Sequence, residues 1–540
     1  MLCIVPASSW AGERVTGIVT DASGDPLRGV MVSAISDDRQ KSISVFSGVD
    51  GHFTIENIGS GIDRVRARSV EFEDTFAEIP KDSDPLSFTM EPAKDINMQR
   101  RGDNLFNMVK FDNEEDRMNF KMWCTYCHQI GTAGFRTPEE PVDWETMLRT
   151  MEGFGGLFEH TQEDLVQRMI DAYSPEAMEE WPEYEIPERA QGKALDARIT
   201  EWDMGKQDGT MVHDLEPGLD GQIYAVDMLN DLVMSLDPTT DERNAYRLPG
   251  GKDPETDDAP KKGVHSIECD ADGNMWLTLA LSGEMAKFDV TTKKTDVIAG
   301  LPTGTRAGYP HSLRIDEKGF VWWTDAGMGE DRPFFGVSSV NPDTYEVVGY
   351  DLPSAGQAVN ASEAFGESSG ITPYGVDIAP DGKVWYSKLN GNRIGRIDPS
   401  VPEGNVKEWN PPFRGPRRLH VAADGKVWVP GFGSGTIASF DPETEEWDVI
   451  DVPNKSDQFP YALNIHPETG DVWVCGTSND TLLRYIPSEK KFYEYPLPSR
   501  VTYTREIEFD VDGNIGLCNS NYPVRHTERG MGSLIRIEVE

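Results

Sequence analysis

Residues 381–399 read DGKVWYSKLNGNRIGRIDP, and variants of this stretch recur through the C-terminal part of the 540-residue chain. Each copy has a tight turn with a glycine, a short strand that usually carries an aromatic residue, and a second turn and strand often closing in Asp-Pro or Asn-Pro. The turn glycines lie 43 to 63 residues apart at Gly221, Gly273, Gly319, Gly382, Gly425, Gly470 and Gly513. Repeats of this kind, with four short strands each, are typical of propeller blades.

Seven copies predict a closed seven-bladed β-propeller over residues 191–540. The last copy ends at 535–538 without an outer strand, and the segment 198–204 can supply it. Pairing the start of the propeller with its end would remove the exposed sheet edge of an open ring.

Two segments with different sequence patterns precede the repeats. Residues 14–94 alternate apolar and polar in short runs broken by Asp, Gly and Pro, which predicts a small antiparallel β-sandwich. In residues 95–190 the pattern predicts three helices: one at 114–123, one that begins after an N-cap at Asp143, and one that begins at Thr161. This segment is therefore predicted to form a small all-α domain. The chain is therefore predicted to be multidomain and mainly β.

The composition of the chain limits the classes of molecule that it can bind. The chain carries 51 Lys and Arg against 93 Asp and Glu, a formal charge of −42 that repels nucleic acid and anionic lipid. No apolar run reaches the roughly 18 residues of a membrane-spanning helix, so we expect no transmembrane segment. Residues 1–13 read as the remnant of a secretory signal, with an ordinary N-terminal tail as the alternative.

The sequence CTYCH at 124–128 is the sharpest chemical motif. Thiols at Cys124 and Cys127 can add to the two vinyl groups of a haem, which leaves the His128 imidazole as an axial iron ligand. A zinc half-site or a thioredoxin-like redox pair would need a second ligand pair or a βαβ pattern, and neither is present. The motif resembles c-type cytochromes, which implies one covalent haem c and a periplasmic or secreted protein.

Several residues are candidates for the sixth ligand of the haem iron. We expect Met151, since thioether ligation is usual in electron-transfer haems, and since the spacing of Arg136, Trp144 and Met151 resembles the distal segment of small cytochrome domains. Met147, Met169, Met178 and His160 are the other donors in reach. Methionines at helical spacing are also ordinary core residues, and an open or water-ligated iron is a further alternative.

A second set of polar residues appears when the repeats are aligned on their turn glycines. Eight residues earlier, or nine in the sixth copy, stand His213, His265, His311, Tyr374, Arg417, Tyr461 and Arg505. Because the innermost strand of each blade begins there, we expect these side chains to ring the mouth of the central channel and bind a small-molecule substrate. Asp227, Asp325 and Lys388 follow 14 residues after the first, third and fourth members and are predicted to join the site. Channel-lining residues that only hold water are the alternative.

Two family resemblances accompany these patterns. The pattern Gly17-x-Val19, 25–30 and Asp50-Gly51-x-Phe53 resembles the carboxypeptidase regulatory-like domain, whose members mostly serve as spacers or docking modules. The propeller resembles the streptogramin lyase (virginiamycin B lyase-like) family in the stretches 310–313, 381–385 and 392–399.

The lyase resemblance implies elimination from a cyclic ester by a His and a Glu of one blade, a His of the preceding blade and Mg²⁺. The matching residues are His311, Asp325 and His265, so Mg²⁺ or another divalent cation is expected at the propeller mouth. Asp in place of Glu shortens the acid by one methylene, which changes what it can reach.

The two chemical motifs together favour an oxidoreductase. In this interpretation His311 or His265 removes a proton from the substrate, and electrons pass to the haem and then to an external redox partner. A metal-dependent lyase with an ancillary haem domain, and a haem-bearing electron shuttle or binding protein, are the alternatives.

Overall fold

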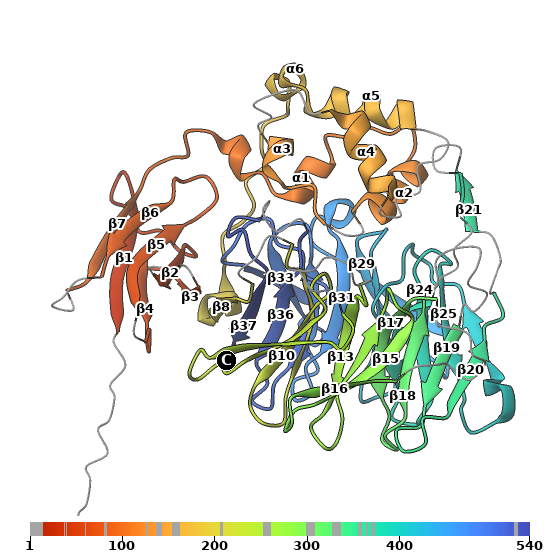
Figure 1. Ribbon diagram of the computed structural model, residues 1–540. Coiled ribbons are helices and arrows are strands. Elements are labelled where there is room, and N and C mark those ends of the chain that lie inside the picture. Colours follow the sequence, from red (N-terminus) through yellow and green to blue (C-terminus); the bar gives the residue numbers. More distant parts are fainter. Residues whose placement is uncertain are drawn as a thin grey trace, which may run out of the picture.

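The computed structural model describes residues 14–36, 38, 40–59, 61–79, 84–125, 128–136, 143–153, 162–205, 209–251, 261–298, 308–326, 336–354, 359–362, 366–368, 373–522 and 527–539. The signal-like residues 1–13, Cys127 and His160 lie outside these ranges. Figure 1 shows an N-terminal β domain beside a propeller and a layer of helices over one propeller face. None of the described helices is long and apolar enough to cross a membrane.

The predicted propeller is confirmed. In the described part of the chain six blades are separate four-stranded sheets, and the seventh is four strands of an eight-stranded sheet. From the channel outward, the first four are β9 (Val212–Pro217), β10 (Ile223–Asp227), β11 (Leu232–Leu236), β12 (Arg243–Arg247); β13 (Val264–Cys269), β14 (Met275–Leu279), β15 (Glu284–Asp289), β16 (Lys294–Ile298); β17 (Pro310–Ile315), β18 (Val321–Asp325), β19 (Gly336–Val340), β20 (Val347–Asp351); and β23 (Pro373–Ile378), β24 (Val384–Lys388), β25 (Arg393–Ile397), β26 (Lys407–Trp409). A small hairpin, β21 (Val359–Ser362) with β22 (Gly366–Ser368), precedes the fourth.

The last three blades close the ring. They are β27 (His420–Val421), β28 (Val427–Gly431), β29 (Thr436–Asp441), β30 (Glu446–Asp451); β31 (Pro460–Ile465), β32 (Val472–Gly476), β33 (Thr481–Ile486), β34 (Lys491–Pro496); and β35 (Glu508–Phe509), β36 (Ile515–Asn519), β37 (Ser533–Glu538) with β8 (Arg198–Asp203). Strand β8 pairs antiparallel with β37, with Glu201 opposite Ile535, so the predicted outer strand comes from the start of the propeller.

The repeated glycine has a backbone reason. All seven turn glycines have φ between +71° and +86°, a region that side-chain-bearing L residues rarely adopt. Each turn therefore tolerates glycine best, and the glycine marks the blade in the sequence.

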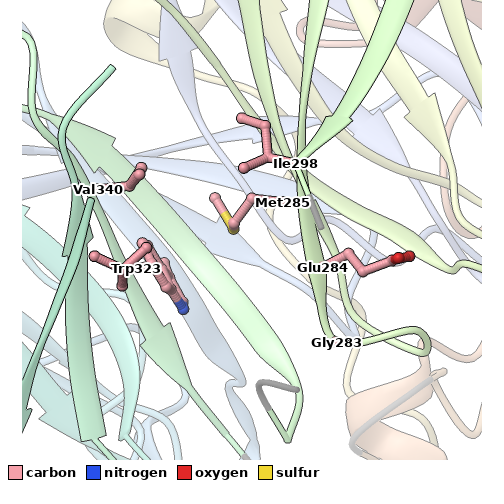
Figure 2. A pocket seen from close by; sticks show the side chains of 7 residues that line it. Gly283, Glu284, Met285, Ile298, Trp323 and Val340 are labelled. Atoms are coloured by element: carbon pink, nitrogen blue, oxygen red, sulfur yellow. The ribbon is translucent and has the colours of Figure 1, made fainter. Parts of the chain in front are cut away.

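Small gaps remain between blades. Figure 2 shows Met285, Ile298, Trp323 and Val340 around a cavity of about 10 Å³ between the second and third blades. The Trp323 indole N–H makes no hydrogen bond to the described residues. A buried water needs two to four polar partners, and this apolar cavity offers too few.

The N-terminal β domain continues the last blade. Its strands are β1 (Val15–Asp21), β2 (Met31–Ser36), β3 (Lys41–Phe46), β4 (His52–Ile55), β5 (Ile62–Arg68), β6 (Thr75–Glu78) and β7 (Leu86–Met90). Strand β3 pairs with β8, with Lys41 opposite Trp202, and so joins β6-β5-β2-β3 to β8-β37-β36-β35 in one sheet. The outer edge of the closing blade is thereby covered.

Two arginines of this domain also reach the propeller. Arg68 Nη1 donates to a carboxylate oxygen of Glu528 at 2.7 Å and to the Pro498 carbonyl at 3.1 Å, and Arg68 Nε bonds Asp74 at 3.0 Å. Arg66 donates to the same Pro498 carbonyl at 2.9 Å. Burial alone would raise the pKa of Glu528, but Arg68 and Arg66 hold it well below its ordinary value.

The helical part comprises a 3₁₀ turn at Ile96–Gln99, α1 (Gly102–Phe106), α2 (Glu114–Cys124), α3 (Ala133–Arg136), α4 (Trp144–Gly153), α5 (Gln162–Tyr173), α6 (Pro175–Glu179) and a 3₁₀ turn at Gly192–Asp196. Two further 3₁₀ turns, at Pro402–Asn405 and Lys455–Asp457, lie in the propeller. The Asp143 cap is confirmed, because its carboxylate accepts the Thr146 N–H at 3.1 Å. Pro175 begins α6, since proline is well suited to the first turn of a helix.

The helical part shares its hydrophobic core with the propeller. One cluster contains Phe106 and Phe120 together with Phe432, Phe459 and Tyr461. The Phe106 and Phe459 rings meet edge to face at 5.2 Å between centroids. The helices therefore lie against the propeller face as one packed unit.

We predict that Arg68→Met lowers the free energy of unfolding by about 3 kcal/mol, because it leaves Glu528 and Asp74 without their main cation in a buried interface. Urea titration followed by tryptophan fluorescence measures the change. Arg14→Met is the matched control, since Arg14 pairs with Glu56 on the surface and should change little. Equal stability of the two variants would contradict the proposed importance of the interface pair.

Candidate functional site

A β-bulge shapes the start of the innermost strands. In the second blade Val264 pairs with Leu279 and Ile267 with Leu277, so that two residues oppose one partner residue. The same shift occurs in the first, third, fourth and sixth blades. A bulge re-aims side chains, and here two consecutive residues can face the channel axis.

The first channel layer is the ring expected from the sequence. All seven members, His213, His265, His311, Tyr374, Arg417, Tyr461 and Arg505, are 3% exposed or less. The three histidine rings lie side by side around one side of the channel, tilted by 42° and 49°, with centroids 3.8 Å apart for His213 and His265 and 4.2 Å apart for His265 and His311. The ring therefore divides into a histidine half and an arginine–tyrosine half.

The histidine half is uncharged. Burial lowers the pKa of His213, His265 and His311 well below the ordinary value, and neighbouring cationic or imidazole groups lower it further. His311 Nδ1 lies 3.1 Å from the Tyr374 carbonyl, which can only accept, so this nitrogen carries the proton. The other nitrogen, Nε2, keeps its lone pair, as a general base or a metal ligand requires.

The opposite half combines cations with hydroxyls. The Tyr374 and Tyr461 hydroxyls are 2.5 Å apart, Arg417 donates to Tyr374 at 3.1 Å and Arg505 to Tyr461 at 3.1 Å. The Arg417 guanidinium lies 3.5 Å from the centroid of the Tyr461 ring. Burial alone would raise the pKa of Tyr461, but the arginines outweigh it and lower that pKa.

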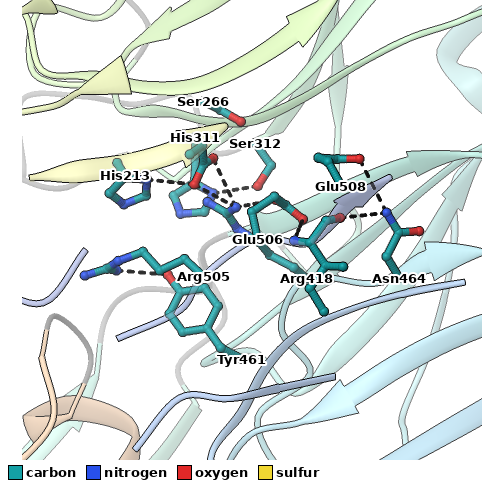
Figure 3. Close-up of polar contacts among 12 residues, drawn as sticks. His213, Ser266, His311, Ser312, Arg418, Tyr461, Asn464, Arg505, Glu506 and Glu508 are labelled. Atoms are coloured by element: carbon teal, nitrogen blue, oxygen red, sulfur yellow. Dashed lines mark hydrogen bonds and ion pairs between the residues drawn. The ribbon is translucent and has the colours of Figure 1, made fainter. Parts of the chain in front are cut away.

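Two deeper layers were missed by the sequence analysis. The second holds the next residue of each blade, Asp214, Ser266, Ser312, Gly375, Arg418, Ala462 and Glu506, and the third holds Glu216, Glu268, Arg314, Asp377, His420, Asn464 and Glu508. Figure 3 shows contacts that link these layers across the channel. Arg418 pairs with Asp214 at 3.0 Å and with Glu506, and Arg314 pairs with Glu268 at 2.9 Å.

His420 belongs to this charged network rather than to an apolar core. Its Nδ1 lies 3.4 Å from Asp377, and its Nε2 lies 3.1 Å from Arg314. Burial would lower the pKa of His420, yet Asp377 and Glu506 raise it to about 9, so the imidazole is charged at neutral pH. The signal in the sequence was the polar residue three places after each ring member.

The three residues predicted to join the ring at the site make their contacts within their own blades instead. Asp227 accepts the backbone N–H of Met211 and Leu229 at 3.0 and 3.1 Å. Asp325 accepts those of Gly308 and Tyr309 at 2.8 and 2.7 Å. Lys388 is fully buried, 2.9 Å from Glu408 and 2.8 Å from Ser354. These contacts hold the loops that support the ring.

The predicted haem-attachment motif is connected to the ring through Tyr503. The Tyr503 hydroxyl donates to the Thr125 carbonyl, between the two cysteines of the motif, and the Tyr503 ring packs on Tyr461 with centroids 5.8 Å apart. Gln129 donates its N–H to Asn521 at 3.2 Å and its side-chain amide to Asp480 at 2.9 Å. Thr125 and Gln129 are thus fixed to the propeller loops.

The described residues of the motif fit a covalent haem. Cys124 ends α2, half-buried against the helical core. His128 Nδ1 lies 3.0 Å from the Gln129 carbonyl and can donate to it, a contact typical of histidines that bind a metal through the other nitrogen. Arg136 is buried, and its guanidinium nitrogen Nη2 makes no hydrogen bond to the described residues. Such a nitrogen suits an ion pair with a carboxylate of the haem.

The candidate sixth ligands lie on the helices nearby. Met151 is half-buried on α4 in the same cluster as Cys124, and Met169 is buried on α5. Met147 is 36% exposed and faces away from this core. Met151 therefore stays the prediction for the second axial position.

The Mg²⁺ expectation fits less well. Mg²⁺ prefers oxygen ligands, whereas the ring offers three imidazoles, and both carboxylate oxygens of Asp325 already accept backbone N–H groups. His265, His311 and Asp325 therefore lack the donor set of a magnesium site.

Comparison with known proteins agrees with this architecture. Residues 14–91 match the family of the carboxypeptidase regulatory-like domain. The propeller has the streptogramin lyase fold. A streptogramin B lyase structure aligns with a TM-score of 0.51 and 16% identity over 65% of this chain and all of that chain. Virginiamycin B lyase from Staphylococcus aureus aligns with a TM-score of 0.50 and 16% identity over 64% of this chain and all of that chain.

A catalytically inactive form of the same Staphylococcus aureus lyase, determined with quinupristin, gives the same TM-score and identity. At 16% identity this likeness establishes the fold alone. Among curated proteins, none matches this chain in sequence.

The titration of Lys121 on α2 tests whether the helical part packs on the propeller as described. Burial lowers the pKa of Lys121 to about 7, with Arg117 contributing, and its ammonium donates to the Gln458 carbonyl of the propeller. Between pH 7 and 10.5 the unfolded chain binds the proton that the folded chain has released, so the free energy of unfolding should rise with pH, by at most about 1.4 kcal/mol per unit.

We therefore predict that Lys121→Met removes this rise, whereas Lys110→Met, at an exposed position, keeps it. Urea unfolding of the wild type and both variants at pH 7 and pH 9 measures the difference. Parallel behaviour of the wild type and Lys121→Met would show that Lys121 does not titrate in this window.

Proposed function

We propose that the protein is a periplasmic or secreted monohaem c-type oxidoreductase, which oxidises a small molecule at the polar ring and passes electrons to an external redox partner. The observation that carries this proposal is the contact between Thr125, inside the predicted haem-attachment motif, and Tyr503, which packs on Tyr461 of the ring. A single residue, Tyr503, thus connects the motif to the ring, and a short separation suits electron transfer, since its rate falls steeply with distance.

Cys124, Cys127 and His128 would hold the haem, with Met151 as the sixth ligand. Arg136, whose Nη2 makes no hydrogen bond to the described residues, would pair with an anionic edge of the group. When bound, a haem supplies one-electron acceptance and donation. Removal of two electrons and two protons from an alcohol or aldehyde hydrate therefore requires two successive one-electron transfers to the external acceptor.

The ring itself suggests the substrate class. Its first layer contains two guanidinium groups, Arg417 and Arg505, and no carboxylate, so it favours an anionic substrate. The hydroxyls of Tyr374 and Tyr461 lie between them as further hydrogen-bonding groups. A small alcohol or aldehyde that bears a carboxylate matches this arrangement.

His311 is the proposed general base. Its Nδ1 proton is held by the Tyr374 carbonyl, and Nε2 can accept the proton that the substrate releases. Burial keeps the imidazole neutral before reaction. The neighbouring Ser312 hydroxyl, 2.9 Å from Nδ1, helps to fix the ring.

The lyase alternative is less well supported. In that chemistry Asp325 would replace a catalytic Glu, but its carboxylate already holds two backbone N–H groups of its own blade. Those contacts orient the carboxylate toward the loop at Gly308 and Tyr309, and Asp reaches less far from the strand than Glu would.

The test uses the full-length protein made in a host that attaches haem c. We predict that carboxylate-bearing alcohols or aldehydes reduce the oxidised haem without oxygen, and that His311→Gln slows this reduction about 100-fold. His52→Gln, an exposed change in the N-terminal domain, is the control and should match the wild type. Stopped-flow absorption in the haem bands gives the rates.

The other outcomes separate the alternatives. A compound consumed while the haem stays oxidised would favour a lyase. A haem reduced only by redox proteins, at a rate unaffected by His311→Gln, would favour a shuttle. Purified protein without a covalent haem spectrum would overturn the proposal.

A further inference from the structure

We propose that His213, Asp214 and His265 bind one first-row transition metal ion, with zinc as the simplest occupant, at the histidine side of the channel. One potential ligand atom of each residue lies within 4.8 Å of those of the other two. All three residues are buried, with 1%, 1% and 3% exposure. The group joins the first and second channel layers across two adjacent blades.

His265 carries an unsatisfied polar atom. Its Nδ1 is buried and makes no hydrogen bond of normal geometry to the described residues. A buried polar atom without a partner costs about 1–3 kcal/mol, so such an atom in a native structure calls for an explanation. A metal ion between His265 and its neighbours would provide one.

His213 and Asp214 place two donor atoms side by side. Nδ1 of His213 lies 2.9 Å from a carboxylate oxygen of Asp214, so one ion can bind this nitrogen and this oxygen together, with the imidazole proton moved to Nε2. Asp214 also pairs with Arg418 at 3.0 Å, yet a carboxylate has about four lone-pair directions and can still bind an ion.

The donor set identifies the class of metal. Two imidazole nitrogens and one carboxylate oxygen suit zinc, iron, cobalt or copper, whereas Mg²⁺ and Ca²⁺ require mostly oxygen. Zinc bonds of about 2.0–2.1 Å place tetrahedral ligand atoms about 3.4 Å apart, so the side chains must approach one another by roughly 1 Å. Three protein ligands leave a fourth position open, as in catalytic zinc sites.

The use of this metal rests on the proposed function. An open coordination position would face the substrate site beside His311, whose ring lies 4.2 Å from that of His265. Metal binding itself depends neither on the haem nor on turnover, so the two proposals can fail separately.

The experiment is equilibrium dialysis of the full-length protein against micromolar Zn²⁺ with excess Mg²⁺, followed by elemental analysis of zinc per chain. We expect one zinc per chain in the wild type and in His52→Gln, which removes an exposed imidazole. His265→Gln and Asp214→Asn should each lower zinc retention at least tenfold, with circular dichroism and urea midpoints to show that they are folded.

Two results would overturn the metal site. One is a wild-type protein that retains no zinc or prefers Mg²⁺. The other is a folded His265→Gln or Asp214→Asn variant that retains zinc as the wild type does. Haem reduction by substrate, measured on the same samples, reports on the proposed function alone.

Discussion

The bulge at the start of the innermost strands is the constraint on which the candidate site depends. Regular strand alternation would turn every second side chain away from the channel. With two residues against one, His213 and Asp214 in the first blade are both buried at the axis, as are Tyr461 and Ala462 in the sixth. The ring therefore lies next to a second layer that contains Asp214, Arg418 and Glu506, and Arg418 connects the two carboxylates of that layer across the channel.

Much of the fold could be predicted from the sequence, because the turn glycines need positive φ and so mark every blade. The strand β8 that closes the ring was also predictable, since the last copy lacked an outer strand. The pairing of β3 with β8 was not, because strand pairing between domains leaves no periodic signal in either one. The core that the helices share with the propeller could not be predicted either, because an amphipathic helix indicates a buried face but not the element that covers it.

The site was predicted in part. Alignment on the glycines found the first layer, whose members the structure brings together, but a two-residue period places Asp214, Arg418 and Glu506 on the wrong face of the strand. Bulges have no strong sequence signature, so the second layer could not be assigned. Asp325 was expected at the site from its spacing, whereas its carboxylate holds the loop backbone at Gly308 and Tyr309. A residue close in register can support a site without facing it.

The covalent order of the chain explains how the helices come to lie over the ring. The helical part begins after β7 of the N-terminal domain and ends before β8, and β8 pairs with β3 of that same domain. Both ends of the helical part are therefore held at one side of the propeller by backbone hydrogen bonds, which leaves it few directions in which to extend. Contacts from Lys121, Thr125 and Gln129 to the propeller loops then fix it over the channel mouth. The N-terminal domain thus contributes to the site without touching it, because it anchors the segment that carries the haem motif.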